Sequence, residues 1–218
     1  MAAAQTSSSA VHTPVMRDEA IAALAPRAGA LYVDGTFGAG GYSAALLAAA
    51  DCRVYALDRD PDAIARGRAL AAQSNGRLEL IEGRFGDMDR LLAARDVTLV
   101  HGVVLDLGVS SPQLDEAARG FSFRHDGPLD MRMDPTRGES AAQWLEHAEE
   151  QQIREVIREY GEERFAKQIA AAIVAARQGR PLTRTRELAD LVGQAVRTRE
   201  PGQDPATRTF QEIGRAHV

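Results

Sequence analysis

Short apolar runs alternate with amphipathic segments over the first half of the chain. Four runs of β-forming residues, at 31–33, 53–57, 78–81 and 102–105, are bounded by polar residues or glycine, as is typical of buried strands. Helical patterns fill the intervals, and the predicted helices cover 17–24, 42–50, 61–72 and 87–94. Asp60 is the expected N-cap of the third helix. Regular alternation predicts right-handed βαβ units and a parallel sheet covered on both faces, an α/β fold of the Rossmann-like class.

The pattern changes after the fourth strand. Residues 108–138 are rich in Gly, Pro, Arg and Asp, so we expect a long loop, a feature that is often functional. From 140 to 196, apolar residues recur at helical spacing, which predicts a second, all-helical lobe. Trp144 belongs to this apolar series, and we expect it in the core of that lobe.

Composition changes this picture little. The chain has 218 residues, of which 44% are hydrophobic and 26% charged, as in an ordinary soluble protein. No apolar run approaches the roughly 18 residues of a membrane helix, and 1–11 lack the pattern of a secretory signal. We therefore expect a disordered leader, a cytoplasmic protein and no membrane partner. The formal net charge of −5 means that any nucleic-acid contact needs a local basic patch.

The first predicted strand leads into a glycine-rich turn that opens a helix. The turn reads Asp34-Gly35-Thr36-Phe37-Gly38-Ala39-Gly40-Gly41. Asp58 lies 20 positions after Gly38, at the tip of the second strand. In a Rossmann-type fold this carboxylate takes the ribose hydroxyls of an adenosine cofactor. The spacing nearly matches the dinucleotide pattern, but Ser43 stands where the last glycine belongs.

The acid at the start of the turn separates two classes of cofactor. Asp34 would repel a pyrophosphate, whereas S-adenosylmethionine carries a cationic ammonium and a cationic sulfonium. We therefore favour the methyl donor. A nicotinamide-dependent oxidoreductase stays open as an alternative, and so does a glycine turn that only bends the chain. No His/Cys cluster has metal-ligand spacing, so we expect no protein-bound metal.

Asp106 follows the fourth strand and joins Asp34 and Asp58 at strand ends. Ligands of open parallel sheets bind at this edge, so we expect the three carboxylates to line one cleft. A carboxylate that accepts a hydrogen bond from an exocyclic amino group would hold the nitrogen lone pair toward the sulfonium and help to remove the proton. Asp106 is therefore the catalytic candidate, and a turn-capping role is the alternative.

Several segments together carry a family resemblance. They lie at 12–15, 34–41, 106–113, 119–123, 126–133 and 160–163. They resemble the bacterial ribosomal small subunit methyltransferase H family (RsmH, formerly MraW) over roughly residues 12 to 211. The resemblance implies methylation of the exocyclic N(4) amino group of a cytosine in 16S ribosomal RNA, with S-adenosylmethionine as cofactor. It implies the small ribosomal subunit as partner, no DNA, and a Rossmann-like methyltransferase domain interrupted by a helical insertion.

The resemblance also implies a donor pocket. Its members would be Gly40, Gly41, Tyr42, Asp58, Phe85, Asp106 and Gln113. The charge argument adds Asp34, and the spacing of the glycine turn to Asp58 adds Gly38. Many relatives have histidine in place of Tyr42, which matters little for a backbone contact. Phe85 would form an apolar wall beside the adenine ring. Gln113 would hydrogen-bond the amino-acid part of the donor or the target base.

The long loop is the candidate RNA contact. It carries Arg119, Phe121, Phe123, Arg124, Arg132 and Arg137. Arginine with aromatics suits phosphate contact and stacking on an extruded base. Nearby aspartates nearly balance the charge, so an internally salt-bridged loop is the alternative. The segment 180–185 would add a second basic contact or start a helix with Thr183 as N-cap. A non-catalytic RNA-binding or ribosome-assembly protein is the other class left open.

These expectations divide the chain into consecutive parts. They are the leader 1–11, the N-terminal part of the methyltransferase domain 12–112, the active-site loop 113–138, the helical insertion 139–200, a return toward the first domain 201–211, and a tail 212–218. A methyltransferase of this class normally has more strands than the four predicted, and the tail reads like translated sequencing-adapter DNA. We therefore expect a truncated fragment with a non-native tail. The sequence is silent on oligomeric state, with a homodimer as one candidate.

Overall fold

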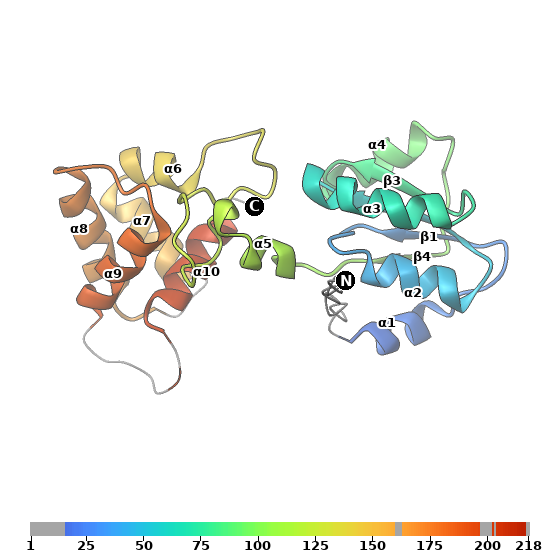
Figure 1. Ribbon diagram of the computed structural model, residues 1–218, viewed down its shortest axis with the longest axis horizontal. Coiled ribbons are helices and arrows are strands. Elements are labelled where there is room, and N and C mark those ends of the chain that lie inside the picture. Colours follow the sequence, from blue (N-terminus) through green and yellow to red (C-terminus); the bar gives the residue numbers. More distant parts are fainter. Residues whose placement is uncertain (1–15, 160–162, 197–201, 203, 217–218) are drawn as a thin grey trace, which may run out of the picture. The chain divides into compact units, whose positions relative to one another are not determined.

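The computed structural model describes residues 16–159, 163–196, 202 and 204–216. The chain divides into two compact units, Met1–Gly108 and Val109–Val218 (Figure 1). The motif residues 12–15 and 160–162 lie outside the described part of the chain. The boundary at 108 lies four residues before the predicted one, so the long loop belongs to the second unit.

The first unit is built on a four-stranded parallel sheet with the order β3-β2-β1-β4. Its strands are β1 (Leu31–Asp34), β2 (Arg53–Asp58), β3 (Leu78–Glu82) and β4 (Gly102–Val104). In the register of the sheet, Val33 of β1 lies beside Tyr55 on one side and Val103 on the other. The parallel pairing confirms the predicted α/β class and the βαβ alternation.

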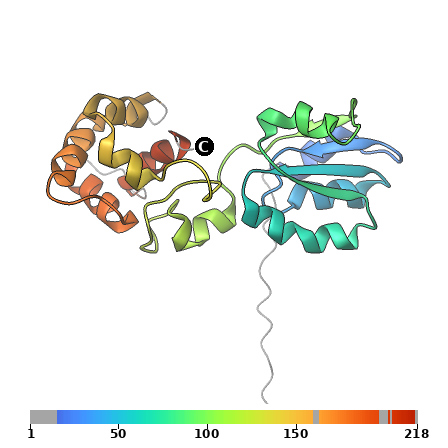
Figure 2. The same ribbon diagram turned by 90° about the horizontal axis from the view of Figure 1, so that it is seen from above.

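Helices cover both faces of this sheet. They are α1 (Arg17–Leu24), α2 (Gly41–Ala49), α3 (Pro61–Gln73) and α4 (Met88–Ala93), with the 3₁₀ helix η1 (Phe85–Asp87) before α4. Alternate strand residues point to opposite faces. Tyr32 and Val54 pack with residues of α1, α2 and α3, whereas Val33 and Tyr55 pack with residues of α4. Figure 2 shows the strands between α3 on one side and α4 on the other.

The start of α3 illustrates how local sequence sets an element. The Asp60 side chain accepts a hydrogen bond from the Asp62 amide at 3.0 Å, which satisfies one of the free amides of the first turn. Pro61 occupies the first helical position, where its fixed φ fits and its missing amide is not needed. The predicted N-cap is therefore confirmed.

The second unit is helical around a single apolar core. Its helices are α5 (Ser111–Asp115), α6 (Ala141–His147), α7 (Glu150–Glu159), α8 (Ala166–Arg177), α9 (Thr185–Ala195) and α10 (Ala206–Ala216), with the 3₁₀ helix η2 (Ala117–Arg119) after α5. The core includes Ile153, Ile157, Ile169 and Ile173, all without exposed surface. Trp144 packs against this core, as predicted.

Three details differ from the sequence-based expectations. The long loop contains α5 and η2, because Ser110 and Gln113 form a hydrogen-bonded cap that starts a short helix. Helix α9 begins at Thr185 with Arg184 as N-cap, so Thr183 is not the N-cap; the Thr183 carbonyl instead accepts from the Leu129 amide at 2.9 Å. Residues 206–216, expected partly as a return to the first domain and partly as a tail, form α10.

Helix α10 packs into the second unit. Phe210 and Ile213 lie in the core of that unit with 4% and 0% exposed surface. Among the described residues, no helix combines the length and the apolar composition that crossing a bilayer would require. The same part of the chain holds no group of three or more His, Cys, Asp or Glu side chains able to bind a metal ion.

Candidate functional site

The glycine turn between β1 and α2 is tied to both neighbouring strands. The Gly35 amide donates to the Val104 carbonyl and the Phe37 amide donates to the Leu57 carbonyl, each at 2.9 Å. Gly40 caps α2 with a φ of 82°, a left-handed conformation that favours glycine. The turn therefore lies at the carboxyl end of the sheet with its backbone geometry set by β4 and β2.

Asp34 lies beneath this turn and is fully buried. Its carboxylate accepts from the Ser43 hydroxyl at 2.7 Å and from the Thr36 amide at 3.2 Å. Burial raises the pKa of Asp34 to about 6, and the hydrogen bonds from Ser43 and Thr36 oppose that rise. The arrangement places a carboxylate directly under the turn and uses it to hold the turn against α2.

Asp58, at the end of β2, holds the turn by hydrogen bonds. One carboxylate oxygen accepts from the Gly38 amide at 2.7 Å, and the other accepts from the Asp60 amide at 2.9 Å. Burial is the largest influence on Asp58 and raises its pKa. A carboxylate offers about four acceptor positions, so these two bonds leave positions for hydroxyl donors of a ligand.

The Phe37 ring is the buried apolar side chain of the turn. Its exposed fraction is 3%. A Cβ atom built on Gly40 would lie 2.8 Å from the ring, and one built on Gly67 of α3 would lie 2.5 Å from it. Only glycine at these positions leaves room for the ring, because such approaches are far inside van der Waals contact. The isolated glycine inside the predicted helix 61–72 was the available signal for Gly67, which the sequence reasoning missed.

Asp106 lies two residues beyond β4, beside the turn. Its backbone amide donates to the Thr36 hydroxyl at 2.7 Å, and the residue is exposed. Tyr42, buried on α2, has its pKa raised first by burial and then by the charges of Asp106 and Asp34. The structure thus brings the three strand-end carboxylates to one edge of the sheet, with Tyr42 nearby. The prediction that all three line a cleft is wrong for Asp34, because the turn and α2 bury it completely.

Phe85 lies at the same edge. It belongs to η1, and 44% of its surface is exposed. Its Cβ atom lies 3.3 Å from the position that a Cβ on Gly35 would take. An exposed aromatic ring next to the turn is therefore present where the adenine wall was expected.

Gln113 is the one predicted pocket residue in the second unit. It lies on α5 and is buried, and its side-chain oxygen accepts from the Ser110 amide at 3.0 Å. Its role in donor binding stays a prediction from the resemblance.

The predicted RNA-contact residues of the loop divide into two groups. Four of them make contacts inside the second unit. Arg119 is buried and donates to the Arg132 and Met133 carbonyls, and Arg132 pairs with Asp130 at 2.7 Å. Phe121 is buried, and Phe123 contacts Phe210 with 4.8 Å between ring centroids. Arg124 and Arg137 are exposed, although Arg137 lies 3.5 Å from Asp134. The salt-bridged alternative therefore describes Arg132 with Asp130 and Arg137 with Asp134. Arg119 instead donates to backbone carbonyls. An RNA contact of these residues stays a prediction.

Comparison with known proteins places the chain in a family. The model of the MraW methylase family matches residues 9–217. The chain belongs to the MraW methylase family. Ribosomal RNA small subunit methyltransferase H of Rhodospirillum centenum is 56% identical over 203 residues, which are 93% of this chain and 61% of that protein. The protein of the same name from Chromobacterium violaceum is 58% identical, over 93% of this chain and 64% of that protein.

This MraW family chain thus spans about 61 to 64% of the length of these relatives. Among solved structures, it is similar to the C-terminal domain of precorrin-6Y C5,15-methyltransferase from Rhodobacter capsulatus. The identity is 26%, the match covers 44% of this chain and 50% of that chain, and the TM-score is 0.35. A likeness at that TM-score adds nothing to the assignment, which rests on the family match.

One member of the turn escaped the sequence reasoning. Ser43 was considered only as a departure from the dinucleotide glycine pattern, yet it is fully buried and donates to Asp34. A short hydroxyl side chain near the start of the helix that follows an acidic strand end was the available signal. The serine that departs from the glycine pattern therefore supplies a buried hydrogen bond that holds Asp34 under the turn.

Proposed function

We propose that this chain is an S-adenosylmethionine-dependent methyltransferase that methylates the exocyclic N(4) amino group of a cytosine in 16S ribosomal RNA. Membership of the MraW methylase family supports the activity. The shared name of the relatives supports the small-subunit ribosomal RNA as substrate. Because that RNA resides in the cytoplasm of bacteria, the same argument makes the cytoplasm the place of action.

The residues at the carboxyl end of the sheet fit the methyl donor. Gly40 presents backbone that no Cβ obstructs, and Phe85 offers an exposed ring for the adenine. Asp58 keeps acceptor positions for the ribose hydroxyls. Asp34 supplies a carboxylate beneath the turn, which attracts the cationic groups of the donor. When bound, the donor would supply an electrophilic methyl group on a sulfonium.

These features assign residues to the donor pocket. Gly38, Gly40, Gly41, Tyr42, Asp58 and Phe85 would hold the donor, with Asp106 beside it, and the buried Asp34 would act through its charge.

Asp106 is the residue we assign to the acceptor. A cytosine amino group is a poor nucleophile because its lone pair is conjugated with the ring. The exposed Asp106 carboxylate would accept a hydrogen bond from this amino group, orient the lone pair, and take the proton that leaves the nitrogen. The hydrogen bond from the Asp106 amide to the Thr36 hydroxyl is the single observation that carries this proposal, because it fixes Asp106 beside the turn.

Substitution of Asp106 tests this assignment. Cells that carry the Asp106→Asn gene in place of the natural one should lose N(4)-methylcytidine from 16S ribosomal RNA, measured by mass spectrometry. General acid–base groups contribute about 10²- to 10⁴-fold to rates, so methylation by the purified variant should slow by a factor in that range. Asp115→Asn, which changes an exposed aspartate at the end of α5, serves as the matched control.

Two outcomes would contradict the proposal. Undiminished methylation by the Asp106→Asn variant would remove Asp106 from the chemistry. Thermal stabilisation of the chain by NAD and not by S-adenosylmethionine would show that the donor assignment is wrong. The second measurement needs only donor binding, so it does not depend on turnover.

A further inference from the structure

A group of cations on α7 and α8 takes no part in the site described above. Arg154 and Arg158 lie four residues apart on α7 and therefore share one face of that helix. Lys167 lies in the first turn of α8. These side chains, with Glu163, Arg164 and Ala166, line a hollow of about 290 Å³, called here the α7/α8 hollow.

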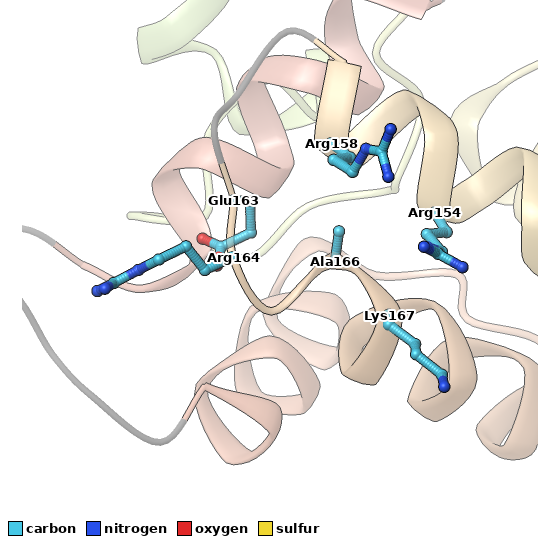
Figure 3. Close-up of a pocket in the computed structure, with 6 residues that line it drawn as sticks. All are labelled: Arg154, Arg158, Glu163, Arg164, Ala166 and Lys167. Atoms are coloured by element: carbon cyan, nitrogen blue, oxygen red, sulfur yellow. The ribbon is translucent and has the colours of Figure 1, made fainter.

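Figure 3 shows how the cations are arranged around the hollow. The charged ends of Arg154, Arg158 and Lys167 lie toward the same side of the close-up, whereas the side chain of Arg164 points the opposite way. The three cations that gather there come from two helices that are close in the sequence. All three line the α7/α8 hollow.

The described carboxylates near the hollow form no ion pair with these three cations. Glu163 is buried, and its carboxylate accepts from the Phe165 amide at 2.9 Å. On α7, Glu155 follows Arg154 directly and Glu150 lies four residues before Arg154. The Glu155 carboxylate accepts from the Gln151 amide group at 2.8 Å. Within the described part of the chain, no carboxylate lies within 4.0 Å of the charged groups of Arg154, Arg158 or Lys167.

Other arginines of the same unit have acidic partners. Arg132 pairs with Asp130, Arg184 with Asp126 and Arg180 with Glu187, at 2.7, 2.7 and 2.6 Å. The cations of the α7/α8 hollow therefore stand apart from the paired arginines of the loop and of α9.

The repulsion between the two arginines of α7 would be relieved by a bound anion. Like charges at positions i and i+4 of a helix, here Arg154 and Arg158, repel each other. A bound phosphate would remove that repulsion, and the planar guanidinium groups match its oxygens. The net charge of the whole chain is −5, so a polyanion can approach only through a local basic patch such as this one.

We infer that the α7/α8 hollow binds backbone phosphates of the RNA substrate and so positions the RNA on the helical unit. The choice of RNA rests on the proposed function. The ligand chemistry is phosphodiester, held by Arg154, Arg158 and Lys167. Such contacts carry no sequence information and fix the position and orientation of the nucleic acid.

Salt dependence of binding tests this inference. The chain is titrated onto a fluorescein-labelled 16S ribosomal RNA transcript, and anisotropy is followed at increasing KCl. The double variant Arg154→Gln/Arg158→Gln should reduce the slope of log K against log salt by roughly 1.4 to 1.8, since each lost phosphate contact removes about 0.7 to 0.9. Arg186→Gln/Arg215→Gln removes the same charge from exposed arginines elsewhere in the unit and should leave the slope nearly unchanged.

Lys167 permits a direct footprint because it is the only lysine in the sequence. Acylation by an N-hydroxysuccinimide ester, measured at Lys167 by mass spectrometry, should slow several-fold when the 16S transcript is bound. Inorganic phosphate at the same phosphate concentration should protect much less. Equal protection by inorganic phosphate would mean a small-anion site and would overturn the inference.

Two further results would overturn RNA binding at the α7/α8 hollow. Unchanged acylation of Lys167 while anisotropy reports bound RNA would place the RNA elsewhere, and absence of RNA binding would also overturn the inference. Neither experiment measures methyl transfer or donor binding. Failure of the proposed function at the carboxyl end of the sheet is therefore distinguishable from failure of the α7/α8 hollow.

Discussion

The carboxylate of Asp34 has no exposed surface, and its hydrogen bonds come from Ser43 and Thr36. Loss of hydration raises its pKa to about 6, because a buried charge is less stable than a hydrated one. The Ser43 hydroxyl and the Thr36 amide stabilise the charged form and limit that rise. The protonation of the Asp34 carboxyl is therefore linked to the hydrogen bonds that hold the turn.

This coupling predicts a pH-dependent stability. The folded chain holds the Asp34 proton more tightly than the unfolded chain, whose carboxyl has its ordinary pKa of 3.8. The stability contributed by the neutral carboxyl is complete below pH 3.8 and is lost as the pH rises through about 6. Across this window, the free energy of unfolding of the natural chain should fall by about 3 kcal/mol relative to that of Asp34→Asn. Urea denaturation at a series of pH values measures the difference.

Ser43→Ala provides the control for this prediction. The substitution removes a donor that stabilises the charged carboxylate, so the fall in stability should continue to higher pH than in the natural chain. Parallel stability curves for the natural chain and Asp34→Asn would show that Asp34 does not titrate in this range.

At the scale of elements, the Phe37 ring packs against the start of α2 and against α3. Gly40 at the start of α2 and Gly67 within α3 leave the space that the ring fills. A helical glycine is normally less stable than alanine by about 0.5–1 kcal/mol, because it loses more backbone entropy on folding. Gly67 therefore gives up helix stability to allow the close packing that positions the turn.

Two helical glycines should respond to alanine with opposite sign. Gly67→Ala would place a Cβ 2.5 Å from the Phe37 ring and 3.0 Å from Leu80, and such overpacking costs about 1–3 kcal/mol. Gly193→Ala on α9 meets no atom within 4 Å and should stabilise its helix by about 0.5–1 kcal/mol. Thermal unfolding followed by circular dichroism gives both values.

A substitution of Phe37 tests whether the cost of Gly67→Ala comes from the ring. Phe37→Leu in the Gly67→Ala background should recover part of the lost stability, because the smaller side chain clears the new methyl group. An undiminished melting temperature for Gly67→Ala alone would mean that the ring does not need the space beside Gly67.

At the scale of the whole molecule, the sheet of the first unit has an apolar edge. Strand β4 pairs with β1 along one side, and none of the described strands pairs with its other side. Val103 and Leu105 beside that edge are 41% and 42% exposed. An open strand edge with apolar side chains favours pairing with another chain, which relates to the homodimer considered from the sequence.

A charge on this strand should oppose association. Val103→Lys is expected to lower the fraction of dimer or larger species in light scattering after size-exclusion chromatography, because edge lysines disfavour strand pairing. Leu99→Lys is the control, since Leu99 is 83% exposed but lies outside the strand. Equal effects of the two substitutions would attribute association to general hydrophobicity and not to the strand edge.

Much of the fold could be predicted because its signals are local. The strands, the helices around them and the Asp60 cap all follow from residues within a few positions of one another. Helix α5 was missed because it is short and shows no apolar period, and the start of α9 was displaced because Leu129 pairs with the backbone before it. That pairing joins segments more than fifty residues apart, which no local pattern reveals.

The sequence by itself determined the α/β class, the order of the elements, the family and the three carboxylates at strand ends. Only the tertiary structure decided which charged side chains find partners. It buries Arg119 and Asp34 in internal hydrogen bonds, and it gathers Arg154, Arg158 and Lys167 around one hollow. The physical reason is that hydrogen bonds and electrostatic attraction depend on distances in space. The sequence specifies such distances only through the complete packing of the chain.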